Sequence, residues 1–168
     1  MVHASPRVLV AGVGNVLHGD DGFGVEVAKR LLAAGALPAG VRVIETGIGG
    51  MSLVQEAMTG CDALLIVDVC ARGGTPGQLY FLDAEPSSLA HLDAHQRRDY
   101  FADTHCATPD RVLHLLAGVG RLPPRVCLLG CEPVDAHTLG LGLSAAVAEA
   151  IAPAVERIRA WTASLAAH

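Results

Sequence analysis

A short apolar strand followed by a glycine-rich turn, within residues 7–24, constrains the fold more than any other part of this sequence. Residues 7–11 are mostly apolar, two closely spaced glycines follow them, and an amphipathic pattern begins at about Gly22. This order predicts a strand, a glycine turn and a helix. In an open α/β sheet, the loop after each parallel strand lies at the carboxyl edge, where ligands usually bind. Because Asp20 and Asp21 stand where the helix should start, we expect chemistry at this turn.

Strand and helix patterns alternate along the rest of the chain. Apolar runs predict further strands, and helical spacing or capping residues predict a helix after most of them. The expected strands are residues 41–45, 62–69, 78–82 and 125–131, and the expected helices begin near residues 22, 52, 108 and 144. Ser52 and Gln55 have the spacing of a capping box for the second of these helices.

The connection between the third and fourth strands decides how the sheet is built. It has only about eight residues, around Pro76 and Gly77, whereas a parallel crossover needs about a dozen or more. We therefore expect the fourth strand to run antiparallel. Residues 84–104 are irregular, and we expect a flap there with one or two helical turns. The sequence predicts an α/β fold, a single three-layer α/β/α domain over residues 1–168 with a five-stranded mixed, mostly parallel sheet.

The composition excludes several classes of function. Half of the residues are hydrophobic, 17% are charged, and no apolar run reaches the length of about 18 residues that a membrane span needs. The net charge is −5 and the chain has no basic cluster beyond Arg97 and Arg98, so we expect no nucleic-acid partner. The first residues do not resemble a secretory signal. We expect a soluble, cytoplasmic monomer with no membrane partner.

The cysteines and two histidines raise the question of a bound metal. Five cysteines make an odd number without the spacing of a disulfide framework, which favours reduced thiols. Cys127 and Cys131 lie on one expected strand, where four residues span roughly 13 Å, too far for ligands of one zinc ion. We expect both thiols to be buried and structural. His91 and His95 would share a helical face, and we interpret them as solvated.

Acidic residues follow two of the expected strands. Asp68 ends the most apolar run of the chain, either as a cap for a loop or as a carboxylate that faces the same edge as Asp20 and Asp21. We favour the second interpretation, because converging carboxylates repel each other unless they share a cation or a proton. His105 precedes a helix at that edge. Asp21, Asp68 and His105 together form an oxygen and nitrogen set suited to a divalent transition metal.

Two other kinds of site fit the sequence less well. A dinucleotide site would use the glycine turn together with Glu45, which ends the second expected strand and could bind a ribose. However, Leu17 replaces the third glycine of that motif, and acids at the helix start would repel a pyrophosphate. A serine nucleophile lacks its Gly-x-Ser-x-Gly elbow, and Cys106 adjoins His105, where neighbouring side chains usually diverge.

An ordered set of motifs resembles the nickel-iron hydrogenase maturation endopeptidases. These motifs are the turn Gly-Val-Gly-Asn-Val-Leu-His-Gly-Asp-Asp-Gly-Phe-Gly of residues 12–24, the apolar strand that ends in Val-Asp68-Val, the segment Asp103-Thr-His105, and Leu-Gly-Cys-Glu-Pro at residues 129–133. They span about residues 7–158 in order. The resemblance implies a peptide-bond hydrolase that removes a C-terminal extension from a hydrogenase large-subunit precursor after nickel insertion.

The resemblance also implies roles for individual residues. The two carboxylates and the histidine that contact nickel in this family match Asp21, Asp68 and His105, and Asp20 is the poorer match. Glu45 matches a further family acid, which is aspartate in some members. The nickel is carried by the substrate, and we expect an attacking water that the metal, Glu45 or Asp68 helps to deprotonate. The alternative is a non-catalytic maturation factor that binds nickel or the precursor.

Overall fold

A five-stranded sheet forms the centre of the computed structural model, which describes residues 6–35, 37–102 and 108–166. The strands lie in the order β2-β1-β3-β5-β4. Their bounds are β1 Val8–Val13, β2 Val41–Gly47, β3 Ala63–Val69, β4 Leu79–Asp83 and β5 Arg125–Cys131. Neighbouring strands pair in parallel except for β4, which runs antiparallel to β5. The mixed sheet predicted from the short connection before β4 is confirmed.

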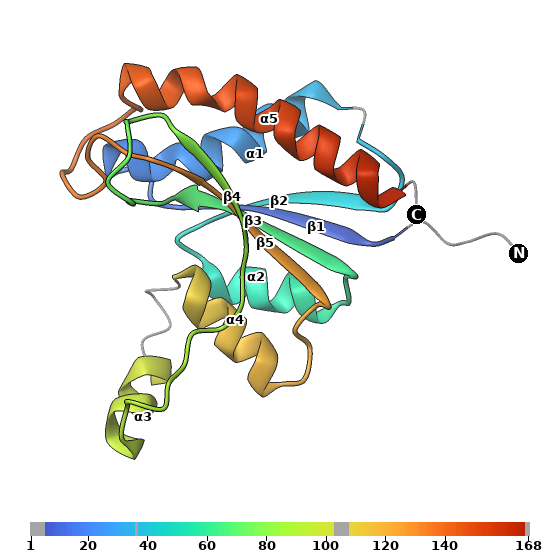
Figure 1. Cartoon of the computed structure of the whole chain (residues 1–168), viewed down its shortest axis with the longest axis vertical. Helices are drawn as coiled ribbons and strands as arrows, with labels where there is room; N and C mark the ends of the chain where they lie inside the picture. Colours follow the sequence, from blue (N-terminus) through green and yellow to red (C-terminus); the bar gives the residue numbers. More distant parts are fainter. Residues whose placement is uncertain (1–5, 36, 103–107, 167–168) are drawn as a thin grey trace, which may run out of the picture.

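Helices cover both faces of the sheet, so the predicted three-layer arrangement is confirmed (Figure 1). The 3-10 helix η1 (Gly19–Gly22) leads into α1 (Phe23–Ala34), which shares one face with α5 (Ala145–Ala166). The other face carries α2 (Gly50–Met58) and α4 (Pro109–Gly118). Within the described ranges, none of these helices combines the length and apolar character that a membrane span requires.

Two hydrophobic clusters, one on each face, hold the layers together. Alternate residues of the central strands point to opposite faces, and both faces are apolar because both are covered. The α1 and α5 side includes Val10, Phe23, Leu31, Leu65, Leu129, Val147 and Ile158. The α2 and α4 side includes Leu9, Ala11, Leu53, Leu64, Ile66, Val112 and Leu116. The continuous apolar run that predicted β3 as a central strand therefore serves both clusters.

The expected cap of α2 needs correction. The capping box at Ser52 and Gln55 is wrong, because α2 already begins at Gly50 and Ser52 lies inside its first turn. The backbone carbonyl of Gly49 accepts hydrogen bonds from the Ser52 and Leu53 amides, so no side-chain cap is used. By contrast, Thr108 caps α4 through a hydrogen bond from the Arg111 amide, with Pro109 in the first turn, close to residue 108, where the sequence predicts that a helix begins.

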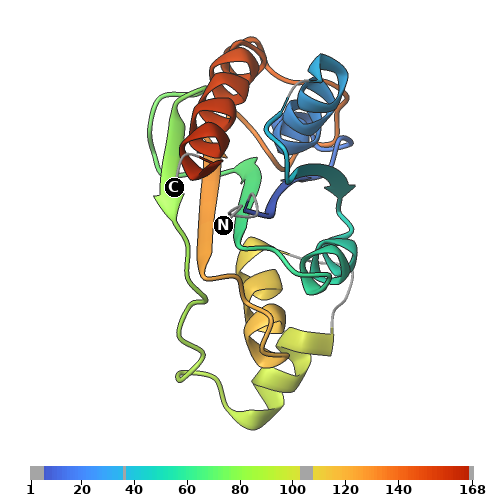
Figure 2. The same cartoon turned by 90° about the vertical axis from the view of Figure 1, so that its right-hand side faces the viewer.

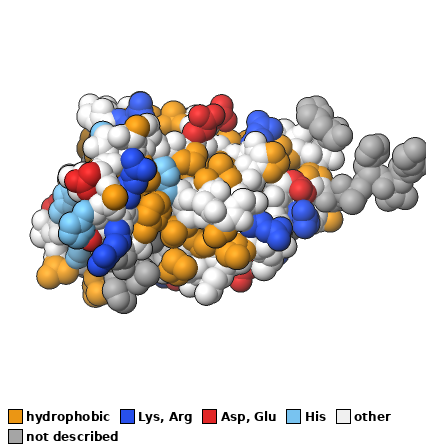
Figure 3. Space-filling model, turned by 90° about the horizontal axis from the view of Figure 1, so that it is seen from below, with side chains coloured by type: hydrophobic (Ala, Val, Ile, Leu, Met, Phe, Trp, Pro, Cys, Tyr) orange, Lys and Arg blue, Asp and Glu red, His pale blue; other side chains and the backbone are white. Residues whose placement is uncertain are grey.

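The expected flap contains a longer helix than its sequence predicts. Helix α3 (Ala94–Ala102) has no apolar stripe, which is why helical periodicity did not reveal it. It projects beyond the sheet (Figure 2). Its histidine and arginine side chains are exposed, and side chains of these kinds gather at one end of the molecule (Figure 3). Asp110 of α4 fastens the segment, because its carboxylate accepts hydrogen bonds from Ser87 and from the Tyr100 hydroxyl.

Helix α1 packs so closely on the sheet that only glycine fits at the contact. A Cβ atom on Gly24 would collide with the backbone carbonyl oxygens of Val13 and Val67. The contact therefore sets the distance between α1 and the strands that lead to Asp21 and Asp68.

We predict that Gly24→Ala destabilises the protein by about 3 kcal/mol or more, because the two strand carbonyls cannot move without breaking the sheet. Urea unfolding followed by circular dichroism measures this loss. Gly118→Ala is the matched control, because a Cβ atom there meets open space in α4. Equal unfolding midpoints for the two variants would contradict the proposed close contact.

Candidate metal-recognition site at the carboxyl edge

The carboxyl edge of the sheet brings Asp21 and Asp68 close to each other. Asp21 lies in η1, directly after the turn that leaves β1, and its Oδ2 accepts a hydrogen bond of 2.9 Å from the Asn15 amide. Asp68 lies near the end of β3, and its Oδ1 accepts a hydrogen bond of 2.8 Å from the Val69 amide. The two carboxylates interact electrostatically, since the charge of Asp21 acts on the pKa of Asp68.

Gly14 lets the turn after β1 pack tightly against the backbone of Asp21. Its backbone φ of 129° lies in the region that favours glycine, and a Cβ atom there would strike the Asp21 carbonyl. The same Cβ position lies 3.7 Å from Asp68 Oδ1. A glycine is therefore needed for the turn to pack on the backbone of Asp21 close to the Asp68 carboxylate.

Asp68 is in an environment that disfavours its negative charge. Burial raises its pKa to about 7, and the nearby charge of Asp21 adds to the rise, while the hydrogen bond from the Val69 amide opposes it. A carboxyl with such a pKa is able to exchange a proton near neutral pH. A bound cation would compensate the same unfavourable charge, so this environment suits either proton transfer or metal binding.

Glu45 lies near the same edge, on β2. It pairs in register with Gly12 on β1, and its exposed side chain contributes to the raised pKa of Lys29 on α1. Glu45 also lines a cavity of about 470 Å³. The other lining residues are Gly14, Asn15, Val16, Leu17, Val25, Thr46, Gly47 and Ile48.

The third expected metal ligand, His105, lies outside the described residues, as does Cys106. Within residues 6–35, 37–102 and 108–166, no group of three or more His, Cys, Asp or Glu side chains is arranged to hold a metal ion. The described part of the site is thus a pair of carboxylates, Asp21 and Asp68. Oxygen donors of this kind suit a divalent ion that receives its other ligands from elsewhere.

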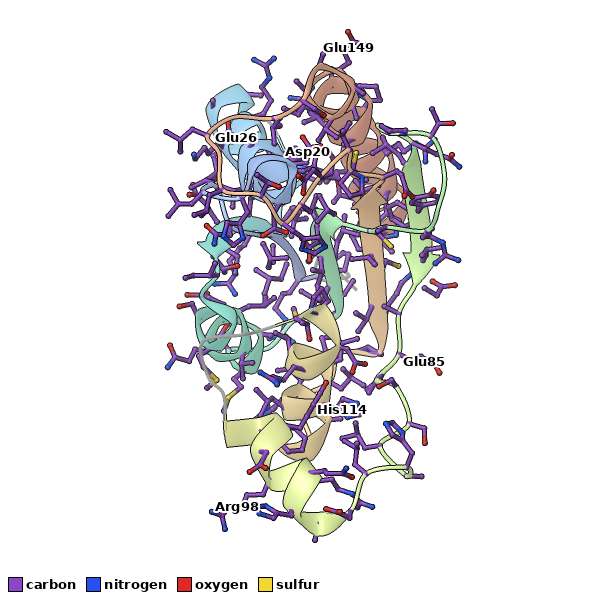
Figure 4. All side chains as sticks on the ribbon, turned by 90° about the vertical axis from the view of Figure 1, so that its left-hand side faces the viewer. Asp20, Glu26, Glu85, Arg98, His114 and Glu149 are labelled. Carbon is purple, nitrogen blue, oxygen red and sulfur yellow. The ribbon has the colours of Figure 1, made fainter. Side chains whose placement is uncertain are left out.

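Asp20 has a structural role that differs from the role of Asp21. Its side chain is only 2% exposed and accepts hydrogen bonds from the Ser144 amide (2.6 Å), the Ser144 hydroxyl (3.0 Å) and the Val134 amide (2.8 Å). A longer contact of 3.4 Å joins it to the Asp135 amide. These bonds connect η1 to the loop between β5 and α5 (Figure 4). Asp20 is therefore a structural residue, and the sequence offered no local sign of partners more than 110 positions away.

Glu132 is a second structural carboxylate, and the sequence did not predict its role. It follows β5, is buried, and accepts hydrogen bonds from the Arg72 amide, the Gly73 amide and the Tyr80 hydroxyl. The hydrogen bonds from Tyr80 and the backbone amides hold the pKa of Glu132 below its usual range. The carboxylate thereby fixes the loop that follows Asp68 and β3.

The thiols and histidines considered as metal ligands lie in the core or on the solvated surface. Cys127 and Cys131 are buried free thiols, as predicted, and burial raises the pKa of Cys131 to about 12. His95 is exposed and lies 3.6 Å from Asp99, and His91 is exposed as well. These residues therefore belong to the core and to a solvated surface.

Comparison with known proteins identifies the family. A family model described as a hydrogenase maturation protease matches residues 25–161. The chain belongs to the hydrogenase maturation protease family. The resemblance that its motifs predicted is confirmed. Because the members of this family are peptidases, the protein is a peptidase.

Individual relatives agree with this assignment. The hydrogenase expression/formation protein HupD of Rhodobacter capsulatus is 37% identical over 164 residues, which cover 92% of this chain and 72% of that protein. The hydrogenase 2 maturation protease of Escherichia coli is 31% identical and covers 92% of this chain and 89% of its own. The structure of the E. coli hydrogenase maturating endopeptidase HybD superimposes with a TM-score of 0.71 at 28% identity, covering 94% and 93% of the two chains.

We predict that Asp20→Ala lowers the free energy of unfolding by about 3 kcal/mol, because it removes the buried carboxylate that accepts hydrogen bonds from Val134 and Ser144 in the loop between β5 and α5. Urea unfolding provides the measurement. Asp99→Ala is the control, since it removes only an exposed contact with His95 and should change the stability by less than about 0.5 kcal/mol. Similar losses in both variants would argue against the anchoring role of Asp20.

We also predict a pH-dependent stability from Asp68 in the metal-free protein. Its folded pKa of about 7 exceeds the ordinary value of 3.8, so its stabilising contribution is full below about pH 4 and is lost as the pH rises towards 7. Relative to the wild type, Asp68→Asn should gain about 2–3 kcal/mol between pH 5 and pH 8. Unfolding in the presence of a chelator measures the difference, and a gain that does not depend on pH would contradict the raised pKa.

Proposed function

We propose that this protease removes a C-terminal extension from a hydrogenase large-subunit precursor after nickel has been inserted. Asp21, Asp68 and His105 would bind the nickel that the precursor carries, so that the metal is part of the substrate. The observation that supports this most directly is the electrostatic interaction of Asp21 with the buried Asp68 beside the tightly packed turn at Gly14. Two neighbouring carboxylates are stabilised by a divalent cation.

Recognition of a metal held by the precursor explains how the enzyme would act only on a loaded substrate. Nickel held by ligands of the precursor accepts further donors only while coordination positions stay open. Carboxylates of Asp21 and Asp68 and an imidazole of His105 are suitable donors. An empty precursor would offer them nothing to bind, and its tail would not be positioned for cleavage.

The cleavage step needs a positioned water and a proton acceptor. Two carboxylates are candidates for this acceptor: Glu45, at the edge of the neighbouring cavity, and Asp68, whose pKa near 7 in the metal-free protein a bound cation would lower. The proton taken from the attacking water would pass to the leaving amine. Because the nickel contact holds the scissile bond near this water, positioning would supply a large share of the rate enhancement.

The free thiols of the described part of the chain support a cytoplasmic site of action. Cys61, Cys70, Cys127 and Cys131 are all unpaired, as is usual in a reducing compartment. We propose a cytoplasmic monomer whose protein partner is the precursor, with no membrane or nucleic-acid partner.

We predict that the purified protein shortens a nickel-loaded large-subunit precursor and leaves the nickel-free precursor intact. Asp21→Ala, Asp68→Ala and His105→Ala should each lower the cleavage rate at least about 100-fold, because each removes a proposed ligand. Gel electrophoresis and intact-protein mass spectrometry detect the product. Asp62→Ala, which removes an exposed ion pair with Arg7, is the control and should cleave normally.

The same assay distinguishes the alternative function. A non-catalytic maturation factor would form a stable complex with the loaded precursor and leave its length unchanged. Normal cleavage by all three alanine variants would overturn the proposed site, and cleavage of the nickel-free precursor would overturn nickel recognition.

A further inference from the structure

Exposed apolar side chains gather on the loops at the carboxyl edge. Ile48 follows β2 and is 62% exposed, Leu17 follows β1 and is 55% exposed, and Leu139 and Leu141 follow β5 with 76% and 82% exposure. We call these four residues the apolar rim. Single exposed apolar residues are common on protein surfaces, but a series of them beside one site indicates an interface.

Hydrogen bonds between two loops, and a cavity that Leu17 and Ile48 both line, connect the parts of the apolar rim. The Gly140 amide donates to the Leu17 carbonyl at 2.9 Å, and the Gly19 amide donates to the Gly140 carbonyl at 2.9 Å. The loop after β5 is thus joined to the turn after β1. Leu17 and Ile48 line the same cavity beside Glu45. The rim therefore runs from the loop of Leu139 and Leu141 to the edge of the candidate site.

Hydrogen bonds to the carboxylates of Asp20 and Asp135 order the loop that carries Leu139 and Leu141. Asp20 accepts hydrogen bonds from the amides of Val134 and Ser144, near the two ends of the loop. The carboxylate of Asp135 accepts hydrogen bonds from the His137 and Thr138 amides. Figure 4 shows this loop crossing the carboxyl edge beside Asp20. A surface that is ordered before binding loses little entropy when a partner arrives.

The charge of the rim limits what it can bind. Residues 14–19 and 134–144 contain no lysine or arginine, and their one acid, Asp135, is engaged by its own loop. The acids beside the rim are Glu45, in the cavity of Leu17 and Ile48, and Glu26, in a second cavity that includes Val16. A second cavity of about 360 Å³ lies beside the rim, and Val16, Leu143 and Ile151 are among the residues that line it. A hollow of this kind suits an apolar side chain of a partner.

We propose that the apolar rim is the docking surface for an uncharged, apolar segment of the precursor next to its scissile tail. The inference rests on the proposed function, which brings the precursor to Asp21 and Asp68. A chain that enters the cavity beside Glu45 passes Leu17 and Ile48, and its neighbouring surface meets Leu139 and Leu141. The rim binds the protein part of the substrate, whereas the carboxylates bind its metal.

The test uses the double variant Leu139→Asp/Leu141→Asp and the matched control Leu32→Asp. Leu32 is 55% exposed on α1 and lies outside the rim and the candidate site. Binding of the nickel-loaded precursor is measured by biolayer interferometry, and its cleavage is measured over a range of precursor concentrations. The double variant should raise Kd and KM about 10-fold to 100-fold while kcat stays within about 2-fold. Leu32→Asp should match the wild type, and all three proteins should share one unfolding midpoint.

The other outcomes separate a failure of the rim proposal from a failure of the proposed function. If the wild type cleaves the precursor and the double variant has unchanged Kd and KM, the rim proposal is overturned and the proposed function stands. If the wild type binds the precursor without cutting it and the double variant loses binding, the rim stands and the protease does not. Failure of the wild type to bind overturns both. A wild-type dimer that the double variant dissociates would make the rim a contact between copies of this chain and overturn its role in docking.

Discussion

The buried carboxylate of Asp20 is the contact on which the carboxyl edge depends. Its side chain stands in η1, immediately before Asp21, and accepts hydrogen bonds from residues at both ends of the loop between β5 and α5. A buried charge is stable only when several donors surround it, so this interaction is strong and specific in geometry. One residue thus couples the position of Asp21 to the loop that presents Leu139 and Leu141.

The two adjacent acids show how position decides the chemistry of identical side chains. The oxygens of Asp20 are occupied by amides and a hydroxyl of its own protein, whereas Asp21 accepts a hydrogen bond only from Asn15 among the contacts of the described residues. Across the glycine turn, burial raises the pKa of Asp68. Oxygens of Asp21 and Asp68 therefore remain available to a cation, whereas those of Asp20 are occupied.

Local pattern was sufficient for most of the architecture and for part of the site. The apolar run of residues 62–69 predicted a central strand, and the short connection before β4 predicted its antiparallel direction. Helix α3 was underestimated because it has no apolar stripe, and the start of α2 was misplaced because backbone groups alone cap it. Glu132 was noted only as part of a motif, because its partners on the loop after β3 lie about 60 positions away.

The amino-acid sequence by itself determined the alternation of strands and helices, the family motifs and the acids that end two strands. Periodicity, turn residues and spacing are properties of neighbouring positions, so they can be read along the chain. Only the tertiary structure decided that Asp20 anchors a loop, that Asp68 has a raised pKa and that Leu17 joins Leu139 and Leu141 in one surface. Burial, charge interaction and surface continuity depend on residues far apart in the chain, and folding alone brings those residues together.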